Sequence, residues 1–236
     1  GLGWFWKQLK MKQEKEDKIQ EMIKRNNIDL SKLEKEQEKL SKSLEINDSI
    51  DFSQVVKIGG FSSAFFQNKI ISACVVLDSD FEILEQKYFS DRVKFPYLPG
   101  FRAYRELPAI LSCFELLDDK PEVVFILGHG ISHPRLGIAS HFSIASGIPS
   151  VGIAESLLIG EVKGENVVHN GKIIAKVLNL KEGSNPLYVS PGNLISMESA
   201  YELAKRFVKL PHKLPEPLHI AHKYAKEVVK ELSEAS

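Results

Sequence analysis

Residues 123–130 have the sequence Val-Val-Phe-Ile-Leu-Gly-His-Gly. The first five are apolar without interruption, which is typical of a short strand buried on both faces. Strands of this kind lie inside sheets that helices cover on both sides. Glycines directly after the strand predict a tight turn at its carboxyl end, where sheets of this class bind ligands. The run therefore predicts an α/β protein whose site lies close to residue 128.

Three strands are expected before this run. Residues 55–60, 69–77 and 81–89 have strand-like sequences, and Asp78-Ser79-Asp80 supplies a turn, so they form an antiparallel meander. After residue 100 the expected elements are helix 102–118, strand 123–127, helix 137–146, strands 149–154, 172–180 and 186–190, helix 196–208 and a last helix from Pro217. This order predicts a mixed sheet, an antiparallel three-strand meander plus parallel strands, flanked by helices in one domain over residues 48–236.

The N-terminal segment differs from the rest in composition. Residues 11–47 are rich in Lys, Glu and Gln, with leucines spaced for one narrow helical face, and predict one or two helices that pack on the main body. The alternative is a contact with a protein partner through this extension. Residues 1–10 contain both tryptophans, Trp4 and Trp6, and are either a leader added by cloning or a natural amphipathic anchor.

The charges of the chain cancel. Its 236 residues include 31 basic and 31 acidic side chains, so a nucleic-acid site has to be a local patch. The hydrophobic fraction of 43% is enough for one large core. Cys74 and Cys113 are expected to be buried thiols, and no apolar run reaches the about 18 residues of a membrane-spanning helix. The expected location is the cytoplasm.

One run combines two prolines with an aromatic residue. Residues 95–106 are Phe-Pro-Tyr-Leu-Pro-Gly-Phe-Arg-Ala-Tyr-Arg-Glu. The prolines around Tyr97 stiffen a loop that could insert between stacked bases and help to displace a nucleotide. The alternative is an ordinary turn with Tyr97 packed on the surface. Glu106 is either a metal ligand or a glutamate favoured by the start of a helix.

The turn after the apolar strand carries two histidines. Residues 128–135 are Gly-His-Gly-Ile-Ser-His-Pro-Arg, in which His129 and His133 could contact a phosphate or a displaced base. Two surface histidines in a turn are the alternative. Nearby cations are either phosphate contacts or ordinary surface charges: Arg92, Lys94, Arg102, Arg105 and Arg135.

In order and spacing, these two runs resemble the endonuclease V family. The resemblance extends over about residues 54–225, through segments at 152–156, 188–193 and 214–222. It implies an RNase H-like fold, Mg²⁺ as the cofactor, and cleavage of DNA or RNA near deaminated purines, inosine or deoxyinosine above all.

The catalytic residues that the resemblance implies are incomplete. The first acid corresponds to Gly60 and the third to Leu127, while the second is kept as Glu106. Glu155 stands in place of the family's lysine, and the helical histidine is kept as His222. Because Mg²⁺ requires several oxygen ligands, and glycine and leucine supply none from their side chains, Glu106 alone is a weak metal ligand.

The residues implied in binding are better kept. The proline loop and the glycines of the base pocket are present, with Arg102 at a position that is apolar in the family. The expected nucleic-acid-binding residues are Pro96, Tyr97, Leu98, Pro99, Gly100, Gly128, His129, Gly130, Ile131, His133, Arg135 and Leu158.

The sequence therefore predicts a protein that binds inosine- or deoxyinosine-containing DNA or RNA, with cleavage lost or much reduced. One alternative is an active metal-dependent endonuclease in which Glu106, Glu155 and His222 form a rearranged catalytic site. Another is a non-catalytic partner subunit, recruited through residues 11–47.

Overall fold

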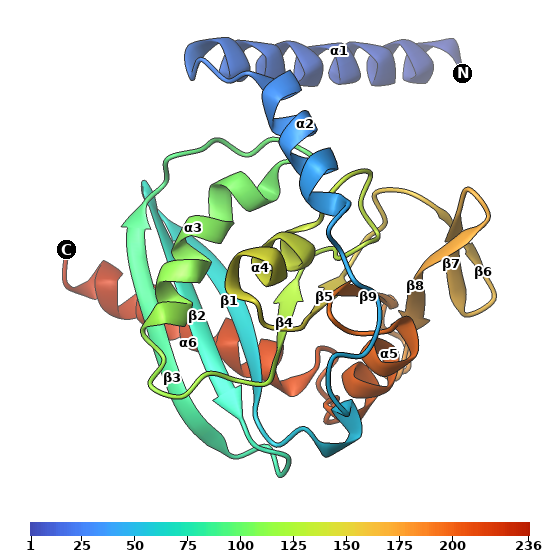
Figure 1. Cartoon of the computed structure of the whole chain (residues 1–236). Coiled ribbons are helices and arrows are strands. Elements are labelled where there is room, and N and C mark those ends of the chain that lie inside the picture. The colour runs from blue at the N-terminus through green and yellow to red at the C-terminus, as the bar shows by residue number, and fades with distance from the viewer.

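The computed structural model describes residues 1–236 and contains one nine-stranded sheet (Figure 1). The strand order is β3-β2-β1-β4-β5-β9-β8-β7-β6. The strands are β1 (Ile58–Phe66), β2 (Lys69–Leu77), β3 (Ile83–Arg92), β4 (Val123–Leu127), β5 (Ser150–Ala154), β6 (Glu161–Lys163), β7 (Asn166–His169), β8 (Lys172–Leu178) and β9 (Leu187–Asn193).

The sheet is mixed, which confirms the predicted fold class. β3, β2 and β1 form an antiparallel meander, and β1, β4 and β5 run parallel. β9 then pairs antiparallel with β5 and opens a second antiparallel section. The sequence does not predict the β6–β7 hairpin, because its short strands are largely exposed and lack a buried apolar alternation.

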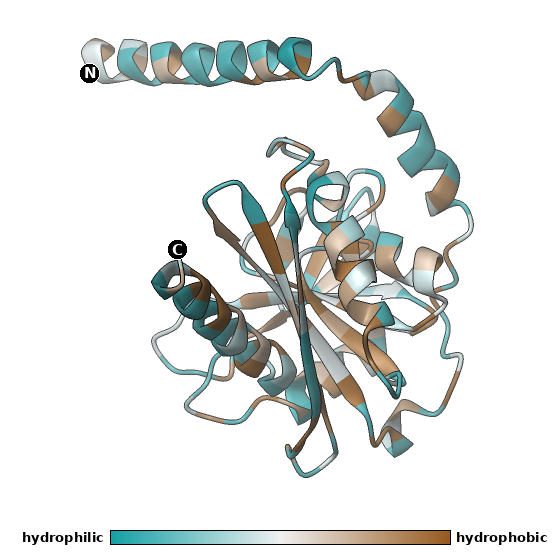
Figure 2. Ribbon diagram, turned by 90° about the vertical axis from the view of Figure 1, so that its left-hand side faces the viewer, coloured by the Kyte–Doolittle hydropathy of each residue, from teal (hydrophilic) through white to brown (hydrophobic).

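Helices cover both faces of the sheet (Figures 1 and 2). Those on one face are α3 (Arg102–Glu115) and α4 (Ile138–Ser146), and those on the other are α5 (Met197–Arg206) and α6 (Glu216–Glu234). The short 3-10 turn η1 (Phe52–Gln54) precedes β1.

The run that opened the sequence analysis is the central strand β4. Val124 and Ile126 join the core under α3 and α4, while Val123 and Phe125 join the core under α5 and α6. The strand is therefore buried on both faces, as predicted. Its carboxyl end leads into the turn at Gly128, at an edge of the molecule where β1, β4 and α3 meet.

The N-terminal extension forms two helices, α1 (Leu2–Arg25) and α2 (Leu30–Ser41). α1 crosses residue 10 without interruption, contains no buried residue and projects from the body (Figure 2). α2 begins after Asp29, whose carboxylate accepts the Lys32 N–H (3.2 Å), and it packs on the body through the buried Gln37. None of the helices combines the length and the apolar character needed to cross a membrane.

Candidate nucleic-acid-binding site

A cavity of ≈ 180 Å³ opens at the carboxyl end of β4. It lies between the loop that enters α3 and the turn that follows β4. Six of its twelve lining residues are hydrophobic, and none is a carboxylate. The lining consists of Tyr97, Leu98, Pro99, Gly100, Arg102, Ala103, His129, His133, Leu136, Ile138, Ser156 and Leu158.

The proline loop forms one wall of this cavity. Leu98 is buried, whereas Tyr97 beside it is 62% exposed. The Phe101 N–H donates to the Leu98 carbonyl (3.0 Å) and closes a tight turn, and Pro99 fixes the backbone inside it. The leucine therefore anchors the loop and the tyrosine lies exposed at the rim of the cavity, where insertion between bases stays a prediction.

His133 forms part of the opposite wall and is held at both ring nitrogens. Its Nδ1 accepts the Arg135 N–H (2.9 Å), and its Nε2 lies 3.1 Å from the Gly100 carbonyl oxygen. Since a carbonyl oxygen only accepts, Nε2 carries the proton and the ring is neutral. The histidine thereby ties the turn after β4 to the proline loop.

His129 lies deeper, with Nδ1 2.8 Å from the Ser132 hydroxyl. Burial is the main cause that lowers its pKa to about 4, and the Arg102 charge adds to the effect. Burial and the Arg135 charge likewise lower the pKa of His133 to about 4. Both rings are therefore neutral at neutral pH, and since His133 uses both of its nitrogens within the protein, only His129 keeps a ring nitrogen, Nε2, without a partner there.

Two expected binding residues hold the turn instead of facing the cavity. The Gly130 N–H donates to Ser190 Oγ (2.8 Å), and the Ile131 N–H donates to the Pro191 carbonyl (2.9 Å). A Cβ at residue 130 would overlap the Pro191 carbonyl, so glycine allows this close approach. Both residues fasten the turn to β9 and lie outside the cavity lining, and a role for them in binding stays a prediction.

Arg135 is also used within the protein. Its guanidinium lies over the Phe101 ring (4.8 Å to the centroid) and donates to Gln37 Oε1 (2.6 Å). A longer bond reaches the Gly100 carbonyl (3.4 Å). Through these contacts Arg135 supports the back of the proline loop, and its predicted contact with nucleic acid stays a prediction. Pro96 precedes the lining residues, and Gly128 borders an adjoining hollow.

The structure also corrects the position of the first acid. A Cβ at Gly60 would overlap the Pro217 backbone and lie 2.8 Å from Pro217 Cβ, so α6 leaves no room for a carboxylate there. The parallel register pairs Gly60 with Phe125 and Phe61 with Ile126, and its continuation brings Ser62, in the middle of β1, beside Leu127 at the end of β4. Ser62 Oγ lies 3.4 Å from His222 Nδ1. Ser62 is therefore the residue that faces the site from β1.

The kept acid, Glu106, is already paired with a cation. It is nearly buried, and its carboxylate is bound by the Arg102 Nε and by Arg102 Nη2 (3.1 Å). The two side chains lie one helical turn apart on α3, which brings them face to face. A Cβ at Gly128 would lie 2.9 Å from Arg102 Nη1, so the guanidinium spans from Glu106 to the end of β4.

The other two predicted catalytic residues lie nearby but separately. Glu155 is exposed in a hollow of ≈ 310 Å³ that adjoins the cavity and that Arg102 and Leu127 also line. His222 is exposed on α6, beside Ser62. Three or more His, Cys, Asp or Glu side chains come together nowhere in the chain in a way that could hold a metal ion.

The residues at this site do not fit the expected Mg²⁺. That ion requires near-octahedral oxygen ligands and usually takes carboxylates from the protein. Leu127 offers no oxygen, Ser62 offers only a neutral hydroxyl, and both Glu106 oxygens are bound by Arg102. The arrangement is suited to holding a neutral base in the cavity and is poorly suited to metal-assisted hydrolysis.

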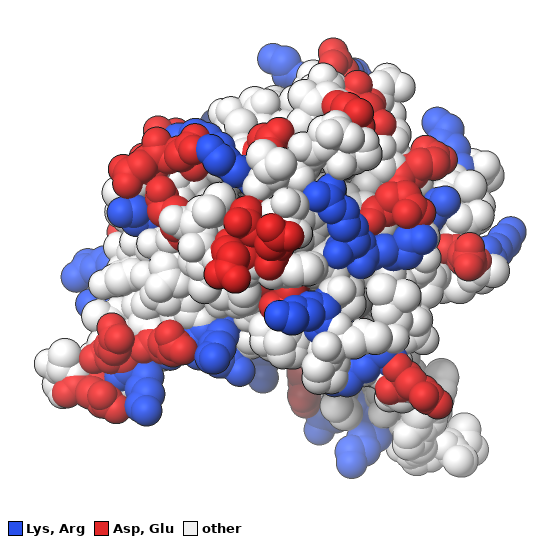
Figure 3. Space-filling view, turned by 90° about the horizontal axis from the view of Figure 1, so that it is seen from below, with Lys and Arg blue, Asp and Glu red and all other residues white.

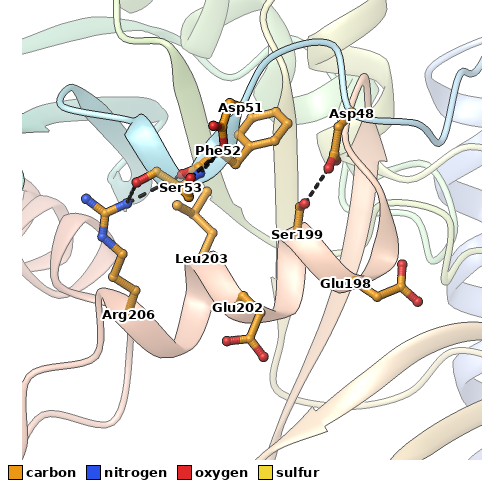
Figure 4. A pocket seen from close by; sticks show the side chains of 9 residues that line it. All are labelled: Asp48, Asp51, Phe52, Ser53, Glu198, Ser199, Glu202, Leu203 and Arg206. Atoms are coloured by element: carbon orange, nitrogen blue, oxygen red, sulfur yellow. Dashed lines mark hydrogen bonds between the residues drawn. The ribbon is translucent and has the colours of Figure 1, made fainter.

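Elsewhere the surface charges are mixed. The face in Figure 3 shows acidic and basic side chains interspersed in small groups. A larger hollow of ≈ 410 Å³ lies between η1 and α5 (Figure 4). Asp48 there accepts the Ser196 N–H (2.8 Å) and the Ser199 hydroxyl (2.5 Å), and Arg206 donates to the Val55 carbonyl (3.0 Å). These bonds attach the segment before β1 to α5, away from the cavity.

The three-strand meander, the parallel strands β4 and β5, and a site beside β1 at the end of β4 define an RNase H-like protein. Solved structures of endonuclease V are among those that resemble it. The Bacillus subtilis protein matches with a TM-score of 0.81 and 22% identity, over 89% of this chain and 95% of that one. The Ciona intestinalis protein, in complex with a 24mer DNA containing an inosine followed by a ribo-adenosine, matches with a TM-score of 0.79 and 23% identity, over 86% and 98%.

Sequence comparison gives the family. The Endonuclease V family profile matches residues 38–223. Endonuclease V of Thermosipho melanesiensis is 36% identical over 186 residues, 75% of this chain and 82% of the relative. The chain belongs to the endonuclease V family, whose members are metal-dependent nucleases that act on nucleic acid.

Proposed function

We propose that this protein binds nucleic acid containing inosine or deoxyinosine, holds the displaced base in the cavity beside Tyr97, and cleaves the strand poorly or not at all. The observation that carries the proposal is the pairing of an intact cavity with a catalytic acid already bound by Arg102. The Ciona intestinalis relative, described in complex with inosine-containing DNA, supports the choice of base.

The size of the cavity supports a single base. Its ≈ 180 Å³ is below the about 300 Å³ at which pockets for drug-sized ligands begin. A base reaches such a pocket only after it has left the stack, at a cost of a few kcal/mol. Tyr97 is placed to offset part of that cost, because an aromatic ring can take the place of the displaced base in the stack.

The chemistry of the lining supports selectivity. The neutral ring of His129, whose Nε2 has no hydrogen-bond partner in the protein, supplies a polar group among apolar side chains, while His133 and the Gly100 carbonyl are already bonded to each other. A site built in this way rejects a base that leaves its polar groups unpaired. Hypoxanthine differs from adenine at the edge that such groups contact, which is how the cavity would distinguish them.

Weak cleavage follows from the missing ligands. Two-metal hydrolysis stabilises both the attacking and the leaving oxygen of the phosphodiester, and needs acidic ligands to do so. Here Leu127 ends β4, and Ser62 lies on β1 just beyond the last residue that pairs with β4. The strand would therefore be held without being cut efficiently.

Binding titrations test the proposal. Strands with one hypoxanthine and matched strands with adenine or guanine are titrated by fluorescence anisotropy, and tighter binding of the hypoxanthine strand is expected. Tyr97→Ala should weaken that binding at least about fivefold, since base stacking contributes about 1–3 kcal/mol. Tyr88→Ala, on the edge strand β3, is the control and should have no effect. Equal affinity for all strands would exclude recognition of the deaminated base.

One observation favours the alternative of a rearranged nuclease. Glu155 shares a hollow with Arg102 and Leu127, so it could approach a metal ion bound at the edge of the site. This alternative predicts Mn²⁺-dependent cleavage that both Glu106→Ala and Glu155→Ala abolish. An uncut strand at high protein concentration, with either Mg²⁺ or Mn²⁺, would rule it out.

A further inference from the structure

We infer that the Arg102 guanidinium takes the place of the metal ion in this protein. It forms a fixed positive charge that pairs with Glu106, keeps divalent cations out, and makes strand binding independent of metal. The claim that strand binding is independent of metal rests on the proposed function. The claim that Arg102 keeps divalent cations out does not depend on it.

The position of the guanidinium carries the inference. Arg102 extends from the first turn of α3 along the helix to Glu106, and two of its nitrogens bind the two carboxylate oxygens. The third nitrogen lies next to the backbone of Gly128, directly after Leu127. The guanidinium therefore occupies the space between the kept acid and the end of β4, where the family resemblance places the third acid at Leu127.

The burial of the pair makes this arrangement stable against exchange. Glu106 has 6% of its side chain exposed and Arg102 has 36%. A guanidinium does not lose its proton at any ordinary pH, so it cannot be neutralised to admit a second cation. A divalent ion approaching Glu106 would have to break a bidentate bond and remain beside an unpaired positive charge.

A separate observation shows that the charge acts on the cavity. Arg102 lines both the cavity and the adjoining hollow. Its Nη1 has no hydrogen-bond partner in the protein, whereas Nε and Nη2 are used. Its charge also contributes to the lowered pKa of His129. The guanidinium therefore keeps one donor free at the place where the strand would pass.

A sequence change at Arg102 alone would not restore a metal site, because Ser62 and Leu127 also lack carboxylates. This allows a matched pair of variants that differ only at residue 102. The double variant Ser62→Asp, Leu127→Asp supplies two acids beside Glu106 and keeps the guanidinium. The triple variant adds Arg102→Leu and removes it.

The experiment measures Mn²⁺ binding by titration calorimetry, with thermal unfolding by circular dichroism to verify folding. The wild-type protein and the double variant are expected to show no binding at millimolar Mn²⁺, and the triple variant to bind at least tenfold more tightly than the double. A double variant that binds as tightly as the triple overturns the inference, and so does a triple variant that folds and binds no better.

A second measurement uses the wild-type chain and so does not depend on whether the variants fold. Its affinity for a hypoxanthine-containing strand should be the same in EDTA and in Mg²⁺. A tenfold loss of affinity in EDTA overturns the inference. If the protein binds hypoxanthine-containing and normal strands equally well, the proposed function fails, while the Mn²⁺ titration still decides the role of Arg102.

Discussion

At the scale of single residues, the hydrogen-bond partners of His133 fix the protonation of its ring. His133 donates to a carbonyl and accepts a backbone N–H, which only the neutral ring can do. Protonation of Nδ1, the nitrogen that accepts this bond, would place its new hydrogen against the Arg135 N–H. Burial of both rings adds to this preference, so the folded protein binds protons at His129 and His133 only under acidic conditions.

This arrangement predicts a stability that depends on pH. The pKa of each ring falls from 6.5 to about 4 on folding, so between those values the unfolded chain binds more protons. The contribution of the two neutral histidines to the free energy of unfolding is complete above pH 6.5. It is lost as the pH falls toward 4, by about 1.4 kcal/mol per pH unit for each histidine. Urea unfolding at pH 7, 6 and 5 measures the slope.

The variant His133→Gln isolates one of these contributions. Its amide keeps a donor and an acceptor but does not titrate, so the slope between pH 6.5 and 4 should fall by one histidine's share. An unchanged slope would contradict the neutral state assigned to His133. His169→Gln, on the exposed β7 hairpin, serves as the control.

Gly60 offers a second prediction at this scale. Gly60→Ala would place a methyl group against the Pro217 backbone. That backbone cannot easily move away, because the start of α6 packs on the sheet. We expect a loss of at least about 1–3 kcal/mol in the free energy of unfolding, as for overpacked cores. At Gly59 the added Cβ would meet side chains alone, Pro121 Cγ at 3.1 Å and Val124 Cγ2 at 3.4 Å, so Gly59→Ala should cost less. Denaturant unfolding of both variants gives the comparison.

The same residue shows where sequence reasoning stops. The local pattern predicts a strand over 55–60, and the family motif can then be matched with Gly60 as the missing acid. β1 in fact runs on to Phe66, because Phe61 to Phe66 pair with β2. Which residue of β1 meets Leu127 depends on pairing with β4 across more than sixty residues of chain. A register shift of two residues keeps every side chain on its face, so the alternation cannot reveal it.

At the scale of elements, α2 supports the cavity from outside. Gln37 is fully buried; its side-chain amide donates to the Gly100 carbonyl (3.1 Å) and accepts from Arg135 Nε (2.6 Å). Tyr104 on α3 donates to Glu36 Oε1 (2.9 Å). The sequence predicts that the extension packs on the body, but a glutamine in a charged helix gives no sign that it is the contact residue.

Removal of this contact should therefore affect both folding and binding. Gln37→Ala leaves the Gly100 carbonyl and the Arg135 guanidinium without one partner each, at a cost of about 1–3 kcal/mol in the free energy of unfolding. Because Gly100 is part of the cavity wall, affinity for the hypoxanthine strand should fall as well. Glu38→Ala, on the exposed side of α2, is the control. Normal affinity in Gln37→Ala would mean that the loop holds its shape without α2.

At the scale of the whole molecule, the chain consists of a folded body with one helix that contributes nothing to its core. α1 buries none of its residues, and Leu2, Trp4, Phe5 and Trp6 are each more than half exposed. The family profile begins at residue 38, so it excludes α1 and most of α2. Yet these two helices differ physically, since α2 supplies the buried Gln37 and α1 supplies no contact of that kind.

Two truncations should separate these roles. A chain of residues 26–236 should keep the thermal midpoint and the strand affinity of the full protein, because no buried apolar surface is lost with α1. A chain of residues 42–236 should unfold several degrees lower and bind more weakly, because Gly100 and Arg135 lose Gln37. Circular dichroism melting and anisotropy titration of both chains measure the thermal midpoint and the strand affinity.

A lower midpoint for residues 26–236 would show that α1 packs on the body in solution. An unchanged midpoint for residues 42–236 would show that α2 does not support the cavity.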